Sequence, residues 1–160
     1  MLPVLREAGV LGEQSDMGEL ARLESVADLI QTRIQVLSEA VPMVRPFYQR
    51  ADELEIAEDA RGQLKDDAAA VLDAAIAALE PISGAAPQPL GGGVEWTHDR
   101  IEDALREALV EQLGLKPRFA FGPLRTAVSG QRISPPLFES MQILGKEETL
   151  ERLRRLRASL

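Results

Sequence analysis

Apolar side chains recur at intervals of three and four residues along most of this chain. The first such run consists of Leu20, Leu23, Val26, Ile30, Ile34, Leu37 and Val41. This spacing places apolar side chains on one face of an α-helix. Asp16 stands where a helix N-cap is expected, and Pro42 and Pro46 break the pattern beyond its end. The sequence therefore predicts one long amphipathic helix that begins after Asp16 and continues to Val41.

The same spacing predicts further helices along the rest of the chain. They cover residues 64–79, 97–113, 117–129, 135–144 and 147–157. An acidic stretch before them, Ala51–Glu58, is compatible with a short helix or a solvated connection. No segment alternates with the period of a β-strand, and Ala and Leu outnumber the β-branched and aromatic residues. We therefore expect an all-α protein with at least six helices.

Residues at the ends of these runs match the preferences of helix termini. Thr97 is an expected N-cap, and Trp96 can pack on Ile101 across the first turn. Ser134 is a second expected N-cap, with Pro135 at the first helical position. Glycines stand where helices should end, at Gly114, Gly130 and Gly145.

A stretch rich in Gly and Pro predicts a boundary within the chain. The segment from Ser83 to Gly93 contains Ser, Pro and Gly at a density that packed elements do not tolerate. We therefore divide the chain into a first helical subdomain (residues 1–82), a linker (83–95) and a second helical subdomain (96–160).

The net charge of -8 conceals a difference between the two halves of the chain. Residues 1–95 carry 7 Lys and Arg against 17 Asp and Glu, whereas residues 96–160 carry 11 against 9. Between Glu111 and Glu139 there is no acidic residue. The same interval contains Lys116, Arg118, Arg125 and Arg132. A local positive surface is therefore possible on an acidic protein, and a polyanion responds to the local field.

Few side chains of this sequence suit catalysis or metal binding. There is no cysteine, and His98 is the single histidine, which argues against zinc sites of the usual ligand types. The glycines at 91–93 lack the strand and the Lys-Ser/Thr pair of a phosphate-binding loop. The carboxylates fall on the polar faces of predicted helices. We therefore expect no catalytic, cofactor-binding or metal-binding residue in this chain.

The composition also bears on where the protein is found. No apolar run reaches the length of a signal-sequence core or of a membrane span. The lack of cysteine is typical of a reducing compartment. We expect a cytoplasmic protein that does not enter a membrane.

One turn in the acid-free interval brings two useful groups close together. Arg125 lies near the middle of a predicted helix, and Ser134 lies at the start of the next, across a turn at Gly130. Such a turn can present a guanidinium and a hydroxyl that read the exposed bases of a single-stranded RNA loop. In the alternative, Arg125 is only solvated and Ser134 only caps a helix. Trp96 likewise can stack on a base or pack on Ile101.

The region from Lys116 to Leu153, KPRFAFGPLRTAVSGQRISPPLFESMQILGKEETLERL, resembles the C-terminal signature of bacterial glutamyl-tRNA synthetases. In that family a Lys-Pro element, a Pro-Leu-Arg helix ending in Gly, a Ser/Thr-Pro turn with Leu-Phe and a Leu-Gly-Lys-Glu element follow in this order. The earlier segment LIQTRIQVLSEA, followed by Phe47 and Tyr48, resembles a stretch of the same family. The resemblance touches most of the chain and is dense from Leu113 to Leu153.

The resemblance implies an anticodon-binding domain, an all-helical cage of two subdomains that follows a class I catalytic domain. It implies that Arg125 and Ser134 contact anticodon bases. Arg33 is our candidate for the arginine that distinguishes the last anticodon base, with Arg45 as its rival. We expect the other basic residues of the acid-free interval to contact the anticodon region as well, namely Lys116, Arg118 and Arg132.

The resemblance also implies that this chain is the C-terminal part of a larger enzyme. The His-x-Gly-His and Lys-Met-Ser-Lys-Ser signatures of class I synthetases are absent, so this chain cannot activate glutamate. ATP and Mg²⁺ would be held by the catalytic domain of the parent glutamate-tRNA ligase, and Met1 can be an internal residue of that parent. The expected partners are the tRNA anticodon loop and that catalytic domain, in a monomer.

Two departures from the family pattern and one alternative remain. The linker is longer than the family usually needs, and the first half of the chain is strongly acidic. Because this acidic half repels phosphate, we expect the isolated chain to bind RNA weakly and with steep salt dependence. In the alternative, the chain is a non-enzymatic protein-protein interaction scaffold whose Ala-rich helix, residues 64–79, packs on a partner. The sequence does not say whether the parent charges only glutamate tRNA or also glutamine tRNA.

Overall fold

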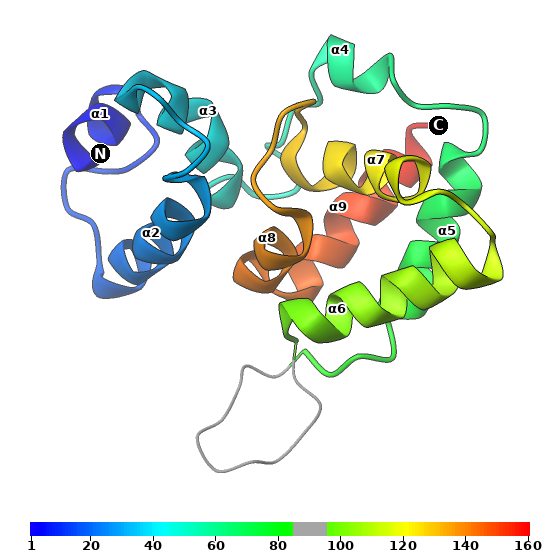
Figure 1. Cartoon of the computed structure of the whole chain (residues 1–160). Helices are drawn as coiled ribbons and strands as arrows, with labels where there is room; N and C mark the ends of the chain where they lie inside the picture. Colours follow the sequence, from blue (N-terminus) through cyan, green and yellow to red (C-terminus); the bar gives the residue numbers. More distant parts are fainter. Residues whose placement is uncertain (85–95) are drawn as a thin grey trace.

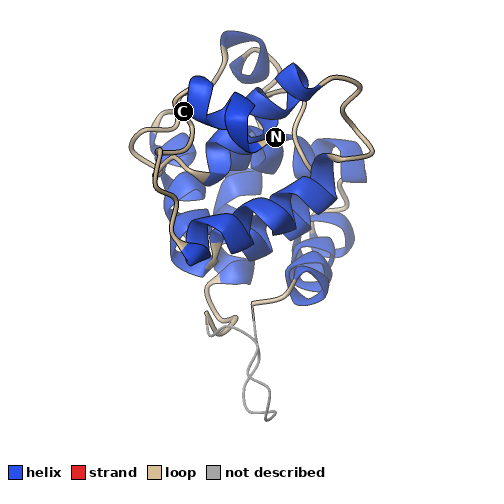
Figure 2. Cartoon of the chain, turned by 90° about the vertical axis from the view of Figure 1, so that its left-hand side faces the viewer, coloured by secondary structure: helices blue, strands red, loops and turns tan. Residues whose placement is uncertain are grey.

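The structure is a computed structural model that describes residues 1–84 and 96–160. All regular secondary structure in these two ranges is helical (Figures 1 and 2), which confirms the all-α class. The α-helices are α1 (Leu2–Glu7), α2 (Met17–Ile30), α3 (Ala40–Val44), α4 (Glu58–Arg61), α5 (Ala68–Leu79), α6 (His98–Leu105), α7 (Pro117–Ser129), α8 (Leu137–Leu144) and α9 (Lys146–Ala158). The 3₁₀ segments η1 (Leu37–Glu39) and η2 (Arg45–Phe47) and the π-helical segment η3 (Arg106–Gln112) complete this set.

The helices surround two apolar cores. The first core is formed by α1, α2, α3 and η2 with the loop after α1, and its buried members are Leu5, Leu11, Leu23, Val26, Ile30, Ala40, Val44 and Phe47. The second core is formed by α5 to α9 together with η3. Figure 1 shows the elements of the first core to the left of α7, α8 and α9. Ile143 and Leu144 of α8 pack against the first core, so α8 takes part in both.

Helix α2 begins where the sequence predicts but ends early. The Asp16 side chain accepts a hydrogen bond from the backbone N–H of Glu19 at 2.7 Å, which confirms the expected N-cap. The helix stops at Ile30, so the prediction of a continuous helix to Val41 is wrong.

A second helical start explains the break after α2. The Glu39 carboxylate accepts hydrogen bonds from the backbone N–H groups of Gln35, at 2.7 Å, and Val36, at 3.5 Å. These contacts satisfy amides that would otherwise lie free at the start of η1. Pro42 does not end a helix, because it lies in the first turn of α3, where its missing N–H needs no partner.

The termini of α6 and α7 follow the predicted pattern, whereas the start of α8 does not. Thr97 caps α6, and Gly130 ends α7 in the left-handed conformation, with φ of 69°. Ser134 is not an N-cap, because α8 begins at Leu137 with Pro136 in the cap position. A proline forces the residue before it into an extended conformation. Two successive prolines therefore delay the start of the helix.

The acidic stretch forms a connection from residue 51 to Ala57, where α4 begins at the next residue. This connection packs on the end of α7. The backbone N–H of Ala57 donates to the Gly130 carbonyl at 2.8 Å. A Cβ at position 130 would lie 2.3 Å from the Glu55 carbonyl oxygen. The connection and the α7 terminus are thus packed backbone against backbone.

Helix α5 packs on α6 and α9 in the second core, although it precedes the predicted linker. Its buried residues are Ala68, Val71, Leu72, Ala75 and Leu79. The apolar face that the scaffold alternative would offer to a partner is therefore occupied within the chain. Residues 85–95 of the predicted linker lie outside the described residues, and a boundary at this segment stays a prediction.

Candidate nucleic-acid interface

The turn between α7 and α8, residues 130–136, lies against residues of the first half of the chain. The Gln131 side-chain amide donates to the Pro42 carbonyl at 2.8 Å. One guanidinium nitrogen of Arg33 donates to the Ser134 carbonyl through a long hydrogen bond of 3.5 Å. The structure therefore brings together Arg33 and Ser134, two of the residues that the sequence predicts for RNA recognition.

Arg125 lies in α7, five residues before Gly130, and is half-buried. Burial lowers the pKa of its guanidinium, the nearby charge of Arg33 lowers it further, and the charge of Glu139 acts in the opposite direction. No side-chain hydrogen bond contributes to this shift, and within the described ranges no ion pair of Arg125 is present. An arginine remains protonated in a protein. The Arg125 guanidinium therefore lies within electrostatic range of a second cation, Arg33, and of one carboxylate, Glu139.

Ser134 contributes mainly through its backbone. The residue is only 8% exposed, and its carbonyl accepts the contact from Arg33. In the described part of the chain, no buried side-chain oxygen or nitrogen lacks a hydrogen-bond partner. Ser134 is therefore a buried residue of the turn rather than the predicted helix cap.

Arg33 and its rival Arg45 occupy different surroundings. Arg33 follows the end of α2, is exposed, and lies close enough to Arg125 to affect the pKa of that residue. Arg45 is also exposed, but its guanidinium donates to the Ala8 carbonyl at the end of α1, at 3.4 Å. Of the two candidates, Arg33 is the one that faces the α7–α8 turn.

The other predicted basic residues fall into two groups. Arg132 is exposed in the α7–α8 turn, next to Ile133, whose 70% exposure is unusual for an isoleucine. Lys116 and Arg118 are exposed at the opposite end of α7. At 1.5 Å per residue, Lys116 lies roughly 13 Å along the helix axis from Arg125. Only Arg132 therefore accompanies Arg125 at the turn.

Trp96 and His98 contact other residues of the chain. Trp96 is 3% exposed, and its indole N–H donates to the Met141 carbonyl at 2.7 Å. It is therefore a core residue, and stacking on an RNA base is excluded in this conformation. The His98 ring lies 3.1 Å from the Asp99 carboxylate on the surface of α6.

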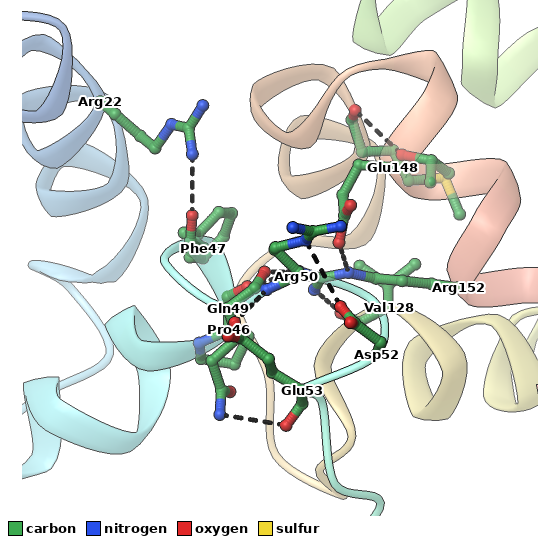
Figure 3. Close-up of polar contacts among 12 residues, drawn as sticks. Arg22, Pro46, Phe47, Gln49, Arg50, Asp52, Glu53, Val128, Glu148 and Arg152 are labelled. Atoms are coloured by element: carbon green, nitrogen blue, oxygen red, sulfur yellow. Dashed lines mark hydrogen bonds and ion pairs between the residues drawn. The ribbon is translucent and has the colours of Figure 1, made fainter. Parts of the chain in front are cut away.

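A buried arginine that the sequence analysis did not single out lies between the two cores. Arg152 of α9 is 2% exposed and hydrogen-bonds to the Glu148 carboxylate and to three backbone carbonyls (Figure 3). Burial lowers the pKa of Arg152, and the Glu148 carboxylate opposes that shift. A signal was present in the sequence, because Arg152 interrupts an apolar stripe that includes Leu156 one turn later.

The described residues hold no group of three or more His, Cys, Asp or Glu side chains that could bind a metal ion. A helix long and apolar enough to span a membrane is likewise lacking in residues 1–84 and 96–160.

Comparisons with known proteins identify relatives of this chain. Glutamate-tRNA ligases of Kocuria rhizophila and Kineococcus radiotolerans are 49% and 48% identical to the chain over 160 residues. The chain covers 29% and 30% of the length of these relatives. A crystal structure of a glutamate tRNA ligase from Elizabethkingia meningosepticum, in complex with its amino acid, has the same fold, with a TM-score of 0.71 at 19% identity. That likeness covers 99% of this chain and 28% of the solved one.

A family comparison covers nearly the whole chain. The sequence model of a family described as "Anticodon binding domain" matches residues 3–157. The match includes both cores and every residue of the candidate interface. It confirms the resemblance inferred from the Lys116–Leu153 region. The chain therefore belongs to the anticodon-binding domain family.

Proposed function

We propose that this chain binds the anticodon loop of a tRNA at the surface formed by Arg33, Arg125 and the α7–α8 turn. The observation that carries the proposal is the half-buried Arg125 guanidinium, which lies beside the like charge of Arg33. A half-buried cation with a second, exposed cation nearby favours a ligand rich in hydrogen-bond acceptors. The base edges and phosphates of an unpaired RNA loop supply such acceptors.

Each residue of the surface has a separate role in this proposal. Arg125 reads a base edge through its planar fork, and Arg33 reads the last anticodon base from the opposite wall. The Ser134 hydroxyl adds one hydrogen bond at the turn. Arg132 contacts the loop backbone. Lys116 and Arg118, at the far end of α7, contact phosphates farther along the RNA and supply affinity rather than base discrimination.

We further propose that the chain works as the tRNA-recognition part of a glutamate-tRNA ligase. The support is the identity to ligases of that name and the short span of the chain within them. In such an enzyme the catalytic domain would hold ATP and Mg²⁺, and anticodon contacts would place the acceptor end of the tRNA in a distant site. The parent would be a cytoplasmic monomer.

We also propose that the two cores are the two subdomains that the family resemblance implies, which puts their boundary before α5 instead of at residues 83–95. The support is packing, because α5 shares its apolar face with α6 and α9 and not with α1 to α3. The functional consequence is that the RNA surface lies between subdomains, with Arg33 on one and Arg125 on the other.

Steady-state kinetics of the parent ligase test the proposed function. An Arg125→Ala change should raise the KM for tRNA or lower kcat for aminoacylation, while glutamate activation measured without tRNA stays unchanged. Arg154→Ala is the control, because Arg154 is exposed on α9 and pairs with Glu80 away from the turn. Equal losses in activation and aminoacylation would refute the assigned role.

A further inference from the structure

Arg152 uses its guanidinium to join three separate segments of the chain. Its Nε donates to the Glu148 carboxylate at 2.7 Å on the same helix. One terminal nitrogen, Nη1, donates to the Val128 carbonyl at 2.6 Å. The other, Nη2, donates to the carbonyls of Pro46 and Gln49 at 2.7 and 2.6 Å. Figure 3 shows these partners converging on the guanidinium from both sides.

The segment that Arg152 holds is also anchored to the first core. The Arg22 guanidinium of α2 donates to the Phe47 carbonyl at 3.0 Å. The Tyr48 hydroxyl donates to the Glu19 carbonyl of α2 at 2.7 Å. Residues 46–49 are therefore fixed to α2 on one side and to Arg152 on the other.

The third partner connects Arg152 to the RNA-binding helix. Val128 lies in the last turn of α7, three residues after Arg125. The Arg152 side chain thus spans from the end of α7 to residues 46–49, which precede the connection between the cores. Arg33 is fixed relative to α2 and Arg125 relative to α7, so the same side chain helps to set the separation of the two RNA-binding arginines.

We propose that Arg152 is a positioning residue for RNA recognition, which holds the two cores in the orientation that places Arg33 opposite Arg125. This inference rests on the proposed function. Besides Arg152, the cores are joined by the apolar contact of Ile143 and Leu144 with the first core. Two hydrogen bonds at the α7–α8 turn also join them, from the Gln131 amide to the Pro42 carbonyl and from Arg33 to the Ser134 carbonyl. The apolar contact is non-directional, and the Arg33 bond is long at 3.5 Å. Hydrogen bonds from a planar guanidinium have defined directions, so they fix orientation as well as distance.

The geometric part of the proposal is tested without RNA. The chain has no cysteine, so spin labels can be placed through Glu24→Cys on α2 and Asp103→Cys on α6, both exposed positions. The labelled chain should give one narrow distance distribution. Adding Arg152→Gln should broaden and shift it, whereas Arg154→Gln on the same helix should leave it unchanged. An unchanged distribution in a folded Arg152→Gln chain overturns the proposal.

The functional part is tested by binding of a glutamate tRNA anticodon stem-loop to the 160-residue chain. Arg33→Ala should weaken binding about 10-fold in the unmodified chain and less than about 2-fold in the Arg152→Gln background. Arg125→Ala should cost the same factor in both backgrounds, because α7 and α9 stay together in the second core. If Arg152 contributed only to stability, the Arg152→Gln background would reduce the binding effects of Arg33→Ala and Arg125→Ala equally, because part of the protein would be inactive.

Other outcomes separate the inference from the function on which it rests. If Arg33→Ala keeps its full effect in the Arg152→Gln chain, Arg152 does not position Arg33. If neither Arg33→Ala nor Arg125→Ala changes binding, the proposed RNA surface fails, while the spin-label distances still decide whether Arg152 fixes the cores. If Arg152→Gln does not fold by circular dichroism, Arg152→Lys replaces it, because an ammonium cannot span all three carbonyls. The same pattern is then expected.

Discussion

The guanidinium of Arg33 donates to the backbone carbonyl of Ser134 at 3.5 Å, although the two residues lie 101 positions apart. Arg33 follows a helix of the first core, and Ser134 precedes a helix of the second. Arg33 also lies close enough to Arg125 for its charge to lower the pKa of that guanidinium. The candidate interface therefore exists only when both cores are docked.

Arg33 should be needed for discrimination of the last anticodon base. In the 160-residue chain, Arg33→Ala should weaken binding of the cognate stem-loop about 10-fold and abolish its preference over a stem-loop changed at that base. The reason is that an arginine fork pairs with one base edge and is not replaced by water. Arg45→Ala is the matched control, because Arg45 contacts the Ala8 carbonyl instead. If the Arg45→Ala chain loses its preference for the cognate stem-loop and the Arg33→Ala chain keeps it, Arg45 and not Arg33 reads the last anticodon base.

The end of α7 should tolerate no side chain at position 130. Gly130 has φ of 69°, and a Cβ there would lie 2.3 Å from the Glu55 carbonyl oxygen. Gly130→Ala should therefore lower the free energy of unfolding by about 2 to 4 kcal/mol, as measured by urea denaturation. Gly122→Ala in the same helix is the control. Apart from its chain neighbours and the nearby backbone of α7 itself, no described atom lies within 4 Å of a Cβ at 122. This change should stabilise the helix by up to about 1 kcal/mol. Equal effects at the two positions would show that backbone packing does not fix this turn.

Tyr48 should make the stability of the chain sensitive to alkaline pH. Burial raises the pKa of Tyr48 above its ordinary value of 10.0, and the nearby Arg22 charge partly opposes this. The folded state therefore favours the neutral phenol. Its stabilising contribution is complete below pH 10 and is lost as the pH rises through the folded pKa.

Two measurements check this. Tyr48 is the single tyrosine, so the absorbance of tyrosinate reports its titration alone, which should lie above the ordinary value. The alkaline fall in unfolding free energy should be smaller in Tyr48→Phe than in the unmodified chain. A titration at or below the ordinary pKa would contradict the burial of this hydroxyl.

Lys116 and Arg118 should contribute affinity without specificity. Replacing both by Ala should reduce the slope of log K against log salt concentration by about 1.5, because each phosphate contact contributes roughly 0.7 to 0.9. The preference among stem-loops of different anticodon should stay the same, since neither residue lies near the turn. Titrations at several salt concentrations measure both quantities. A change in preference with an unchanged slope would mean that these residues read bases.

The local features of the fold could be predicted from the sequence. Helix periodicity identified α2 and α5 to α9, and the chemistry of Asp16, Thr97 and Gly130 marked their ends. Helix periodicity could not reveal the break after Ile30, because apolar residues continue at the same spacing through Val41. The competing start at Glu39 depends on a side-chain contact that the spacing does not encode.

The sequence selected residues for the candidate site but did not indicate how the fold brings them together. An acid-free interval and a family resemblance pointed to Arg125 and Ser134. The predicted start of α8 was wrong, because the second proline, Pro136, delays the helix to Leu137. The burial of Arg152, in the middle of α9, was missed because arginine is usually solvated. Its partners at Pro46 and Gln49 are more than 100 positions away, and no local pattern brings such segments together.

The most direct measurement is titration of the 160-residue chain with a glutamate tRNA anticodon stem-loop at low salt, compared with its Arg125→Gln variant. The unmodified chain should bind with a dependence on anticodon sequence, and the variant should lose about 10-fold or more in affinity. Thermal unfolding of the variant should be unchanged or slightly higher, because a half-buried guanidinium beside Arg33 is removed. Binding that is equal in the two chains, or that ignores anticodon sequence, would contradict the assignment of this surface to RNA.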